Sequence, residues 1–207
     1  WLVVPRRHSS AVVLCAVWLM GAGAGIAAQQ LVDRVVARVN GIVVFLSDVR
    51  AAVGFGLIEA GEDAAQVHEI VQRLLLLGEV SRFPPPDPAP DDVAAEVARM
   101  KARVPNAAVF LTTHGLTESD VVSMARDTLR IQTYLAQRFG PNMLVSEEAV
   151  LEYYKAHPAE FMRDGVPQPF PAVQSVARER ASAERRREAV AQWLRDLEGR
   201  AEVSTPK

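Results

Sequence analysis

The chain has 207 residues, of which 49% are apolar and 23% charged, with a formal net charge of −2 and one cysteine. This length is sufficient for one domain with a substantial core, and the composition excludes a wholly disordered chain. A net charge so close to zero argues against a protein whose main partner is nucleic acid or an anionic membrane surface.

The first residues have the pattern of a secretory signal. Arg6 and Arg7 precede an uncharged segment, residues 11–28, which ends in small residues. A basic start, an apolar stretch and a small-residue end are the three parts of such a signal, so we expect residues 1–28 to be removed. A retained transmembrane anchor is the alternative, although three glycines make the second half of the segment a poor helix.

The only cysteine, Cys15, lies inside the predicted signal peptide. The exported chain is therefore expected to contain no thiol. This excludes a disulfide framework, a cysteine nucleophile and a thiolate metal site from the mature protein.

The mature chain is predicted to begin with a short β-hairpin. Residues 34–40 and 42–46 are rich in β-branched side chains, and Asn40 and Gly41 lie between them. Asn-Gly supplies the positive φ angles that a tight hairpin turn requires.

A first helix is predicted over residues 48–60, with Ser47 and Asp48 as candidates for its N-cap. Gly54 and Gly56 lie inside this segment and are expected to weaken the helix.

Helical spacing of apolar residues, interrupted by prolines and glycines, predicts six more helices. They are expected over residues 64–83, 91–104, 107–114, 118–139, 147–157 and 172–198. Residues 83–90 and 162–171 are predicted as loops, and residues 201–204 as a possible short strand. The predicted fold class is mainly α, a multi-helix core with an N-terminal hairpin.

The last helix has an apolar side that needs a partner. Its apolar residues at helical spacing are Val173, Val176, Val190, Trp193, Leu194 and Leu197. We therefore expect the C-terminal helix to pack back on residues 32–139, and the short strand to cover an edge of the hairpin.

No catalytic, metal-binding or cofactor-binding pattern is present. The histidines are His8, His68, His114 and His157, and none has the spacing of a metal site. Glu147, Glu148 and Glu152 could form an acid–base set, but acidic residues at a helix start are already favoured by the helix dipole. We predict no cofactor, no metal and no catalytic residue.

Two further segments have ordinary structural explanations. Residues 178–188 contain five arginines and three glutamates in an interleaved pattern, which is typical of a solvated helix face rather than a nucleic-acid site. The proline-rich segment 83–90 could bind a polyproline-recognition module, but a stiff loop between helices is the favoured interpretation.

The order of segments resembles the SurA-type periplasmic chaperones. The similar segments are residues 32–49, 128–139, 145–161 and 169–203, which together extend over nearly all of the mature chain. The resemblance implies one chaperone domain over residues 29–207. Its N-terminal part would be residues 32–161, closed by a helix and strand at residues 172–204.

Many members of that family carry a parvulin prolyl-isomerase domain after the segment that residues 145–161 resemble. Here only about ten residues separate the two flanking segments, so that catalytic domain is absent. The resemblance implies a non-enzymatic, ATP-independent holdase of the periplasm that binds unfolded outer-membrane or secreted proteins, without nucleic acid or stable membrane insertion. A periplasmic adaptor or structural protein with one fixed partner is the alternative, and a prolyl isomerase is less favoured.

A holdase needs exposed apolar surface and adaptable side chains. The predicted client-binding residues are Phe55, Leu57, Met100 and Phe110. Phe55 and Leu57 lie on the glycine-weakened helix, where loose packing is expected. Burial in the core is the alternative for all four residues.

Overall fold

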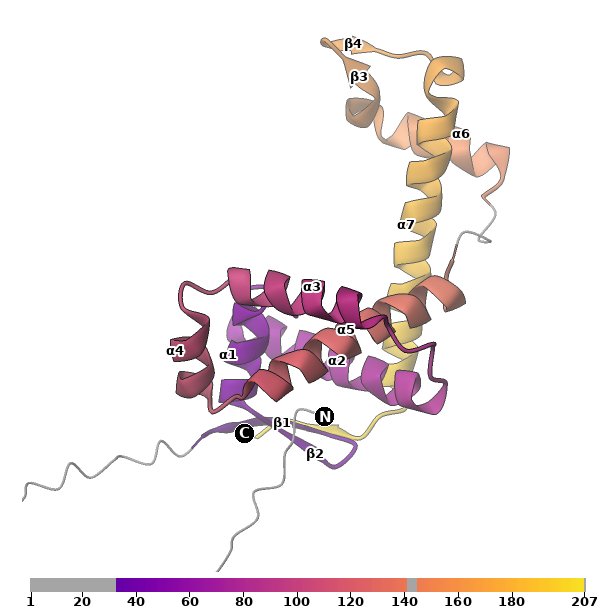
Figure 1. Cartoon of the computed structure of the whole chain (residues 1–207). Helices are drawn as coiled ribbons and strands as arrows, with labels where there is room; N and C mark the ends of the chain where they lie inside the picture. Colours follow the sequence, from indigo (N-terminus) through magenta and orange to yellow (C-terminus); the bar gives the residue numbers. More distant parts are fainter. Residues whose placement is uncertain (1–32, 141–144, 207) are drawn as a thin grey trace, which may run out of the picture.

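Figure 1 shows the computed structural model of the chain, which describes residues 33–140 and 145–206. The predicted signal peptide lies outside the described residues. The elements in chain order are β1 (Val35–Val39), β2 (Ile42–Phe45), α1 (Leu46–Gly54), α2 (Asp63–Arg82), α3 (Pro90–Ala102), α4 (Ala107–His114), α5 (Glu118–Arg138), α6 (Glu147–Ala156), the 3-10 helix η1 (Pro158–Phe161), β3 (Met162–Arg163), β4 (Val166–Pro167), α7 (Phe170–Glu198) and β5 (Val203–Ser204). The predicted mainly α fold class, with its hairpin and closing helix and strand, is confirmed.

The N-terminal hairpin and the last strand form one antiparallel sheet in the order β2-β1-β5. Asn40 and Gly41 have φ angles of 48° and 84°, the left-handed values that this turn requires. Val39 lies opposite Val203 of β5. Two hydrogen bonds fix this pairing: the Asn40 N–H donates to the Glu202 carbonyl at 2.9 Å, and the Glu202 N–H donates to the Asn40 side chain at 3.0 Å. The chain end therefore covers an edge of the hairpin.

Helix α1 is shorter than the predicted segment 48–60, and its cap differs. Phe45 occupies the N-cap position, and its N–H donates to the Asp48 carboxylate at 2.9 Å. The Ser47 side chain instead hydrogen-bonds Asp33. Gly56 has a φ of +68°, a value that ends the helix and that other residues rarely adopt.

A body, defined as residues 33–140 and 189–206, contains the sheet and most helices (Figure 1). One core, the sheet cluster, joins the sheet, α1, α2, α5 and the end of α7. Its most buried large residues include Val39, Val49, Ile70 and Val80. Trp193 of α7 enters this cluster against Tyr134 of α5, with ring centroids 5.9 Å apart. The C-terminal half of α7 is thus part of the body.

The first half of α7 belongs to a distal lobe, defined as residues 145–188, at the far end of this long helix (Figure 1). There it packs on α6 and η1 through a small core of Val150, Tyr153, Phe161, Ala177 and Ala181. Along α7, no side chain between Ala181 and Trp193 is buried. The protein therefore has two packed regions that share one helix.

The distal lobe contains the clearest departure from the predicted loops. Residues 162–171 were expected as a loop, yet they include the antiparallel pair β3 and β4. Asp164 and Gly165 form its turn at φ angles of 53° and 77°. Asp-Gly is a hairpin signal, so this element could have been predicted from the sequence.

Candidate functional site

The four predicted client-binding residues lie in one apolar cluster of the body. We call it the methionine cluster, because Met100 and Met124 are both buried in it. Its buried residues are Phe55, Val93, Met100, Val104, Leu111, Val121, Met124 and Ala125. Leu57 and Phe110 are half-buried and pack against it. The cluster thus joins the end of α1 with α3, α4 and α5.

These residues are packed rather than exposed. Phe55 and Met100 are each 1% exposed. The Phe110 ring meets the Phe55 ring edge-on at a centroid distance of 4.9 Å. Gly54 lies so close beneath the Phe110 ring that a Cβ there would overlap it. The expected loose packing around this glycine is therefore wrong, since the missing side chain allows the close approach of α4.

Helix α4 forms a thin outer wall over the methionine cluster. Of its eight residues only Leu111 is buried, and Val109 is 60% exposed. The Asn106 side chain caps its start by accepting the Val109 N–H, and Gly115 ends it at a φ of +65°. A short helix with one buried residue has few buried contacts to hold it in place, so we expect α4 to open more easily than the longer helices of the body.

A buried charge links α2 to α5 beside this cluster. Arg73 is 8% exposed, donates to the Thr128 hydroxyl at 2.8 Å, and has an Nε without a partner among the described residues. Burial lowers the pKa of Arg73, against the attraction of Asp127 and Glu96. Burial likewise raises the pKa of Asp127. The burial of Arg73 could not be predicted from the sequence pattern, because a single arginine within an apolar helix face can equally extend its charge to solvent.

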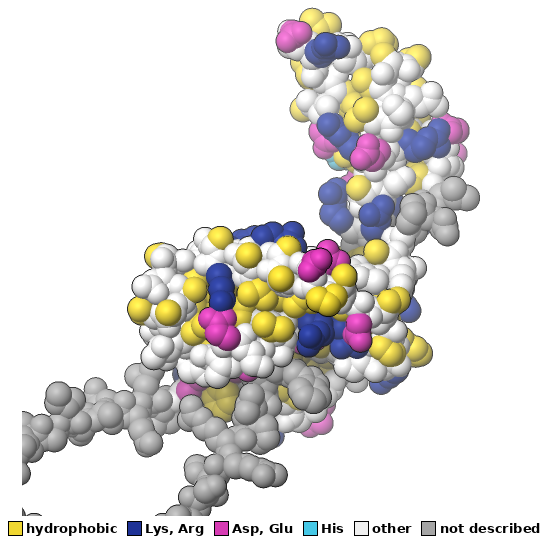
Figure 2. Space-filling model, viewed as in Figure 1, with side chains coloured by type: hydrophobic (Ala, Val, Ile, Leu, Met, Phe, Trp, Pro, Cys, Tyr) yellow, Lys and Arg dark blue, Asp and Glu magenta, His cyan; other side chains and the backbone are white. Residues whose placement is uncertain are grey.

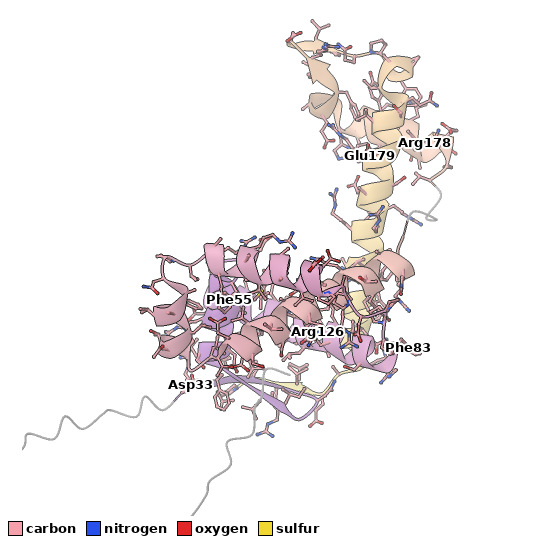
Figure 3. All side chains as sticks on the ribbon, in the orientation of Figure 1. Asp33, Phe55, Phe83, Arg126, Arg178 and Glu179 are labelled. Atoms are coloured by element: carbon pink, nitrogen blue, oxygen red, sulfur yellow. The ribbon has the colours of Figure 1, made fainter. Side chains whose placement is uncertain are left out.

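Apolar surface is exposed at other places. Figure 2 shows apolar side chains gathered on the face of the body where α3 and α5 lie, between charged groups. Phe83 is 59% exposed at the end of α2, away from Phe55 (Figure 3). At the tip of the distal lobe, Met162 and Val166 are 46% and 59% exposed. These three residues were not among the predicted client-binding residues. The spacing of apolar residues along the sequence does not show which of them remain exposed after folding.

The acidic residues considered as an acid–base set do not converge. Glu147 pairs with Arg178 and also accepts a hydrogen bond from Gln174. The hydrogen bond from Arg178, more than any other contact, holds the pKa of Glu147 below its ordinary value. Glu152 lies instead at a shallow hollow between α6 and α7, and Glu148 is exposed.

The described histidines are far apart in the fold. His68 faces Glu198 at 3.6 Å, while the His114 ring lies tilted against Phe110 and the His157 ring stacks on Tyr153. Among residues 33–140 and 145–206, no group of three or more His, Cys, Asp or Glu side chains is arranged to hold a metal ion.

Comparisons with protein-family models, with curated proteins and with solved structures find no match to this chain. Within the described part of the chain, no helix is both long and apolar enough to cross a membrane.

Proposed function

We propose that the protein is an ATP-independent periplasmic holdase that binds unfolded outer-membrane or secreted proteins. The ordered sequence resemblance to the SurA-type chaperones supports this proposal, and the predicted signal peptide supports export. The observation that carries it is the methionine cluster, in which Phe110 of the short helix α4 packs with Phe55, Leu57 and Met100.

The cluster has the chemistry that a holdase requires. Methionine side chains are flexible and polarisable, so they adapt to clients of different shape. Aromatic rings supply a large contact area with few rotatable bonds. No specific reaction is needed, because binding requires only apolar surface that can be reached by an extended chain.

Access to the cluster requires α4 to move. Burying one large apolar side chain contributes about 1.5–3 kcal/mol, and α4 contributes Leu111 and part of Phe110. Its displacement therefore costs a few kcal/mol, well below a typical total stability of about 5–15 kcal/mol. A client that gains about 8 kcal/mol, the equivalent of micromolar affinity, can offset this cost.

Light scattering tests the holdase activity directly. A urea-denatured porin is diluted into buffer with the chain lacking residues 1–28, without nucleotide. We expect equimolar protein to suppress the scattering. If excess protein leaves scattering unchanged while one native partner binds tightly, the adaptor alternative replaces this proposal.

Cysteine labelling tests the site. Met100→Cys places a thiol in the methionine cluster, and Ile70→Cys places the matched control in the sheet cluster, where Ile70 is also 1% exposed. We expect maleimide to label Met100→Cys at least about tenfold faster, since opening of α4 is cheaper than global unfolding. Added client should slow that reaction. Equal labelling rates would contradict the movement of α4.

The proposal also excludes prolyl isomerisation. The resemblance places the catalytic domain of relatives between residues 161 and 169, where this chain has only η1's end, β3 and β4. A protease-coupled proline-peptide assay should give the buffer rate. Catalysis that survives rigorous removal of host isomerases would overturn this part of the proposal.

A further inference from the structure

One edge of β1 is covered only by the short, exposed strand β5. The two strands pair through two residues each, with Val203 opposite Val39 and Ser204 opposite Arg38. Both residues of β5 are exposed, Val203 by 40%. Because β1 is five residues long, residues 35–37 have no strand partner on this side among the described residues. A two-residue strand makes few contacts, so we expect β5 to leave β1 more easily than β2 does.

The pairing of β5 with β1 does not continue past Ser204. At the same register Pro206 would come opposite Val36, and proline has no N–H to donate to a neighbouring strand. Residues 205 and 206 are exposed and belong to no strand. Since β5 occupies the position beside β1 (Figure 1), another strand can pair there only by displacing it.

The strand β5 shows which kind of segment this edge accepts. The Asn40 N–H donates to the Glu202 carbonyl, so the backbone of Glu202 points toward β1. Backbone groups alternate between the two edges of a strand, so Ser204 also directs its N–H toward β1, while Val203 directs its N–H away. Val203 lies opposite the buried Val39, on the core face of the sheet. The edge therefore accepts an extended, antiparallel segment with apolar residues at alternate positions.

We propose that the β1 edge binds an extended segment of another polypeptide, in which apolar and polar residues alternate, after β5 has moved away. An added strand gains affinity from backbone hydrogen bonds and specificity from alternate side chains. An incoming segment can pair along more of β1 than β5 does. β5 is then a tethered competitor, because its attachment to α7 gives it a high effective concentration at the edge.

This site is separate from the methionine cluster, which contains no residue of the sheet. Its use does not require α4 to move. The proposal also does not rest on the holdase activity, because an adaptor with one fixed partner could use the same edge.

Fluorescence anisotropy with three peptides tests the backbone pairing. In the fluorescein-labelled probe, valine and serine alternate over about nine residues, with a lysine at each end for solubility. One counterpart carries N-methyl groups on the serines, whose N–H groups would donate to β1. The other carries them on the valines, whose N–H groups would point away. We expect the serine-methylated peptide to bind at least about tenfold more weakly than the valine-methylated one, which should bind as the probe does.

A disulfide between β5 and β1 tests the displacement. Val39→Cys together with Val203→Cys places two thiols at directly opposite positions outside the hydrogen-bonded pairs, where Cα atoms lie about 4.5 Å apart. A disulfide can span this separation. The chain lacking residues 1–28 has no other cysteine. We expect the reduced form to bind the probe and the oxidised form of the same protein to bind at least about tenfold more weakly, because β5 can no longer leave.

Circular dichroism confirms that both forms are folded. Probe binding that survives oxidation, or equal binding of the two methylated peptides, overturns the proposal. Analytical ultracentrifugation without peptide tests the other occupant. A dimer of the reduced form that is absent from the oxidised form would show that the edge accepts a second copy of this chain instead. Because peptide binding is measured directly, its failure leaves the holdase proposal, tested by porin scattering, unaffected.

Discussion

Helix α7 is held in two different ways at its two ends. At the C-terminal end, Trp193 and Leu197 enter the sheet cluster, and the strand after the helix pairs with β1. At the N-terminal end, Ala177 and Ala181 allow close packing against α6, and ion pairs lie around them. Large side chains thus anchor α7 to the body, while small side chains permit contact in the distal lobe. We therefore expect a smaller side chain to destabilise the C-terminal end of α7, and a larger side chain to destabilise its N-terminal end.

The largest effect is expected from Trp193→Ala. The ring is 8% exposed and lies between Tyr134 and Phe139, with the Arg138 guanidinium 4.8 Å from its centroid. Its removal leaves a cavity in the sheet cluster and should lower the free energy of unfolding by about 3–5 kcal/mol. Urea denaturation followed by circular dichroism measures this loss. A change below about 1 kcal/mol would show that the helix end is not anchored as described.

Ala177→Leu should disturb the other end by the opposite mechanism. Ala177 is fully buried, so a larger side chain overpacks the α6–α7 contact and should cost about 1–3 kcal/mol. Trp193 is the only tryptophan after residue 28, and its fluorescence reports on the body alone. We expect partial loss of helical circular dichroism on heating while the fluorescence transition stays in place. A joint shift of both signals would show that the two regions unfold as one unit.

Gly54→Ala sharpens the comparison within the body, where it tests the wall over the methionine cluster. The added Cβ would displace the Phe110 ring, so we expect a loss of about 1–2 kcal/mol and faster maleimide labelling of Met100→Cys. Gly78→Ala is the matched control, because nothing lies within contact distance of a Cβ at that helical position. The control should gain about 0.5–1 kcal/mol. Equal effects of the two substitutions would contradict the role of Gly54.

The smallest expected effect is a difference in pH dependence. Burial, more than the charge of Asp33, raises the pKa of Asp48 in the body. The folded state therefore binds a proton at Asp48 more readily than the unfolded state does. The buried Asp48 carboxylate destabilises the fold at neutral pH, and this destabilisation is removed as the pH falls through the raised pKa. The lowered pKa of Glu147 in the distal lobe has the opposite effect on stability. Its contribution is present above the ordinary value of 4.5 and is lost as the pH falls through the folded value.

Thermal melts from pH 7 to pH 3 measure this difference. Glu147→Gln should reduce the acid sensitivity of the distal lobe and leave the fluorescence transition of the body unchanged. Asp48→Asn should raise the stability of the body slightly at pH 7, by less than about 1 kcal/mol, and remove its part of the pH dependence. The same acid response in both variants would contradict the assignment of the two carboxyls.

The sequence predicted most of the fold because its signals are local. Asn40-Gly41 specifies the hairpin turn, prolines and Gly115 delimit helices, and the spacing of Trp193 and Leu197 predicts a packed helix end. The role of Gly54 could not be predicted in this way, since it depends on Phe110, which is far away in the chain. The burial of Arg73 beside α5 is equally a tertiary property.

The candidate site was predicted only as a set of residue types. Nothing local connects Phe55 with Met100, and their common cluster arises from the tertiary packing of the segment after α1 with α3, α4 and α5.

Between Ala181 and Trp193 no side chain of α7 is buried, so this stretch of helix is an arm that carries the distal lobe. An α-helix rises about 1.5 Å per residue, so the twenty residues from Trp193 back to Val173 extend about 30 Å. A tilt of about 10° at the Trp193 anchor would displace the far end by about 5 Å, since displacement equals arm length multiplied by angle. Such a tilt would change the positions that the exposed Met162 and Val166, at the tip of the distal lobe, can reach.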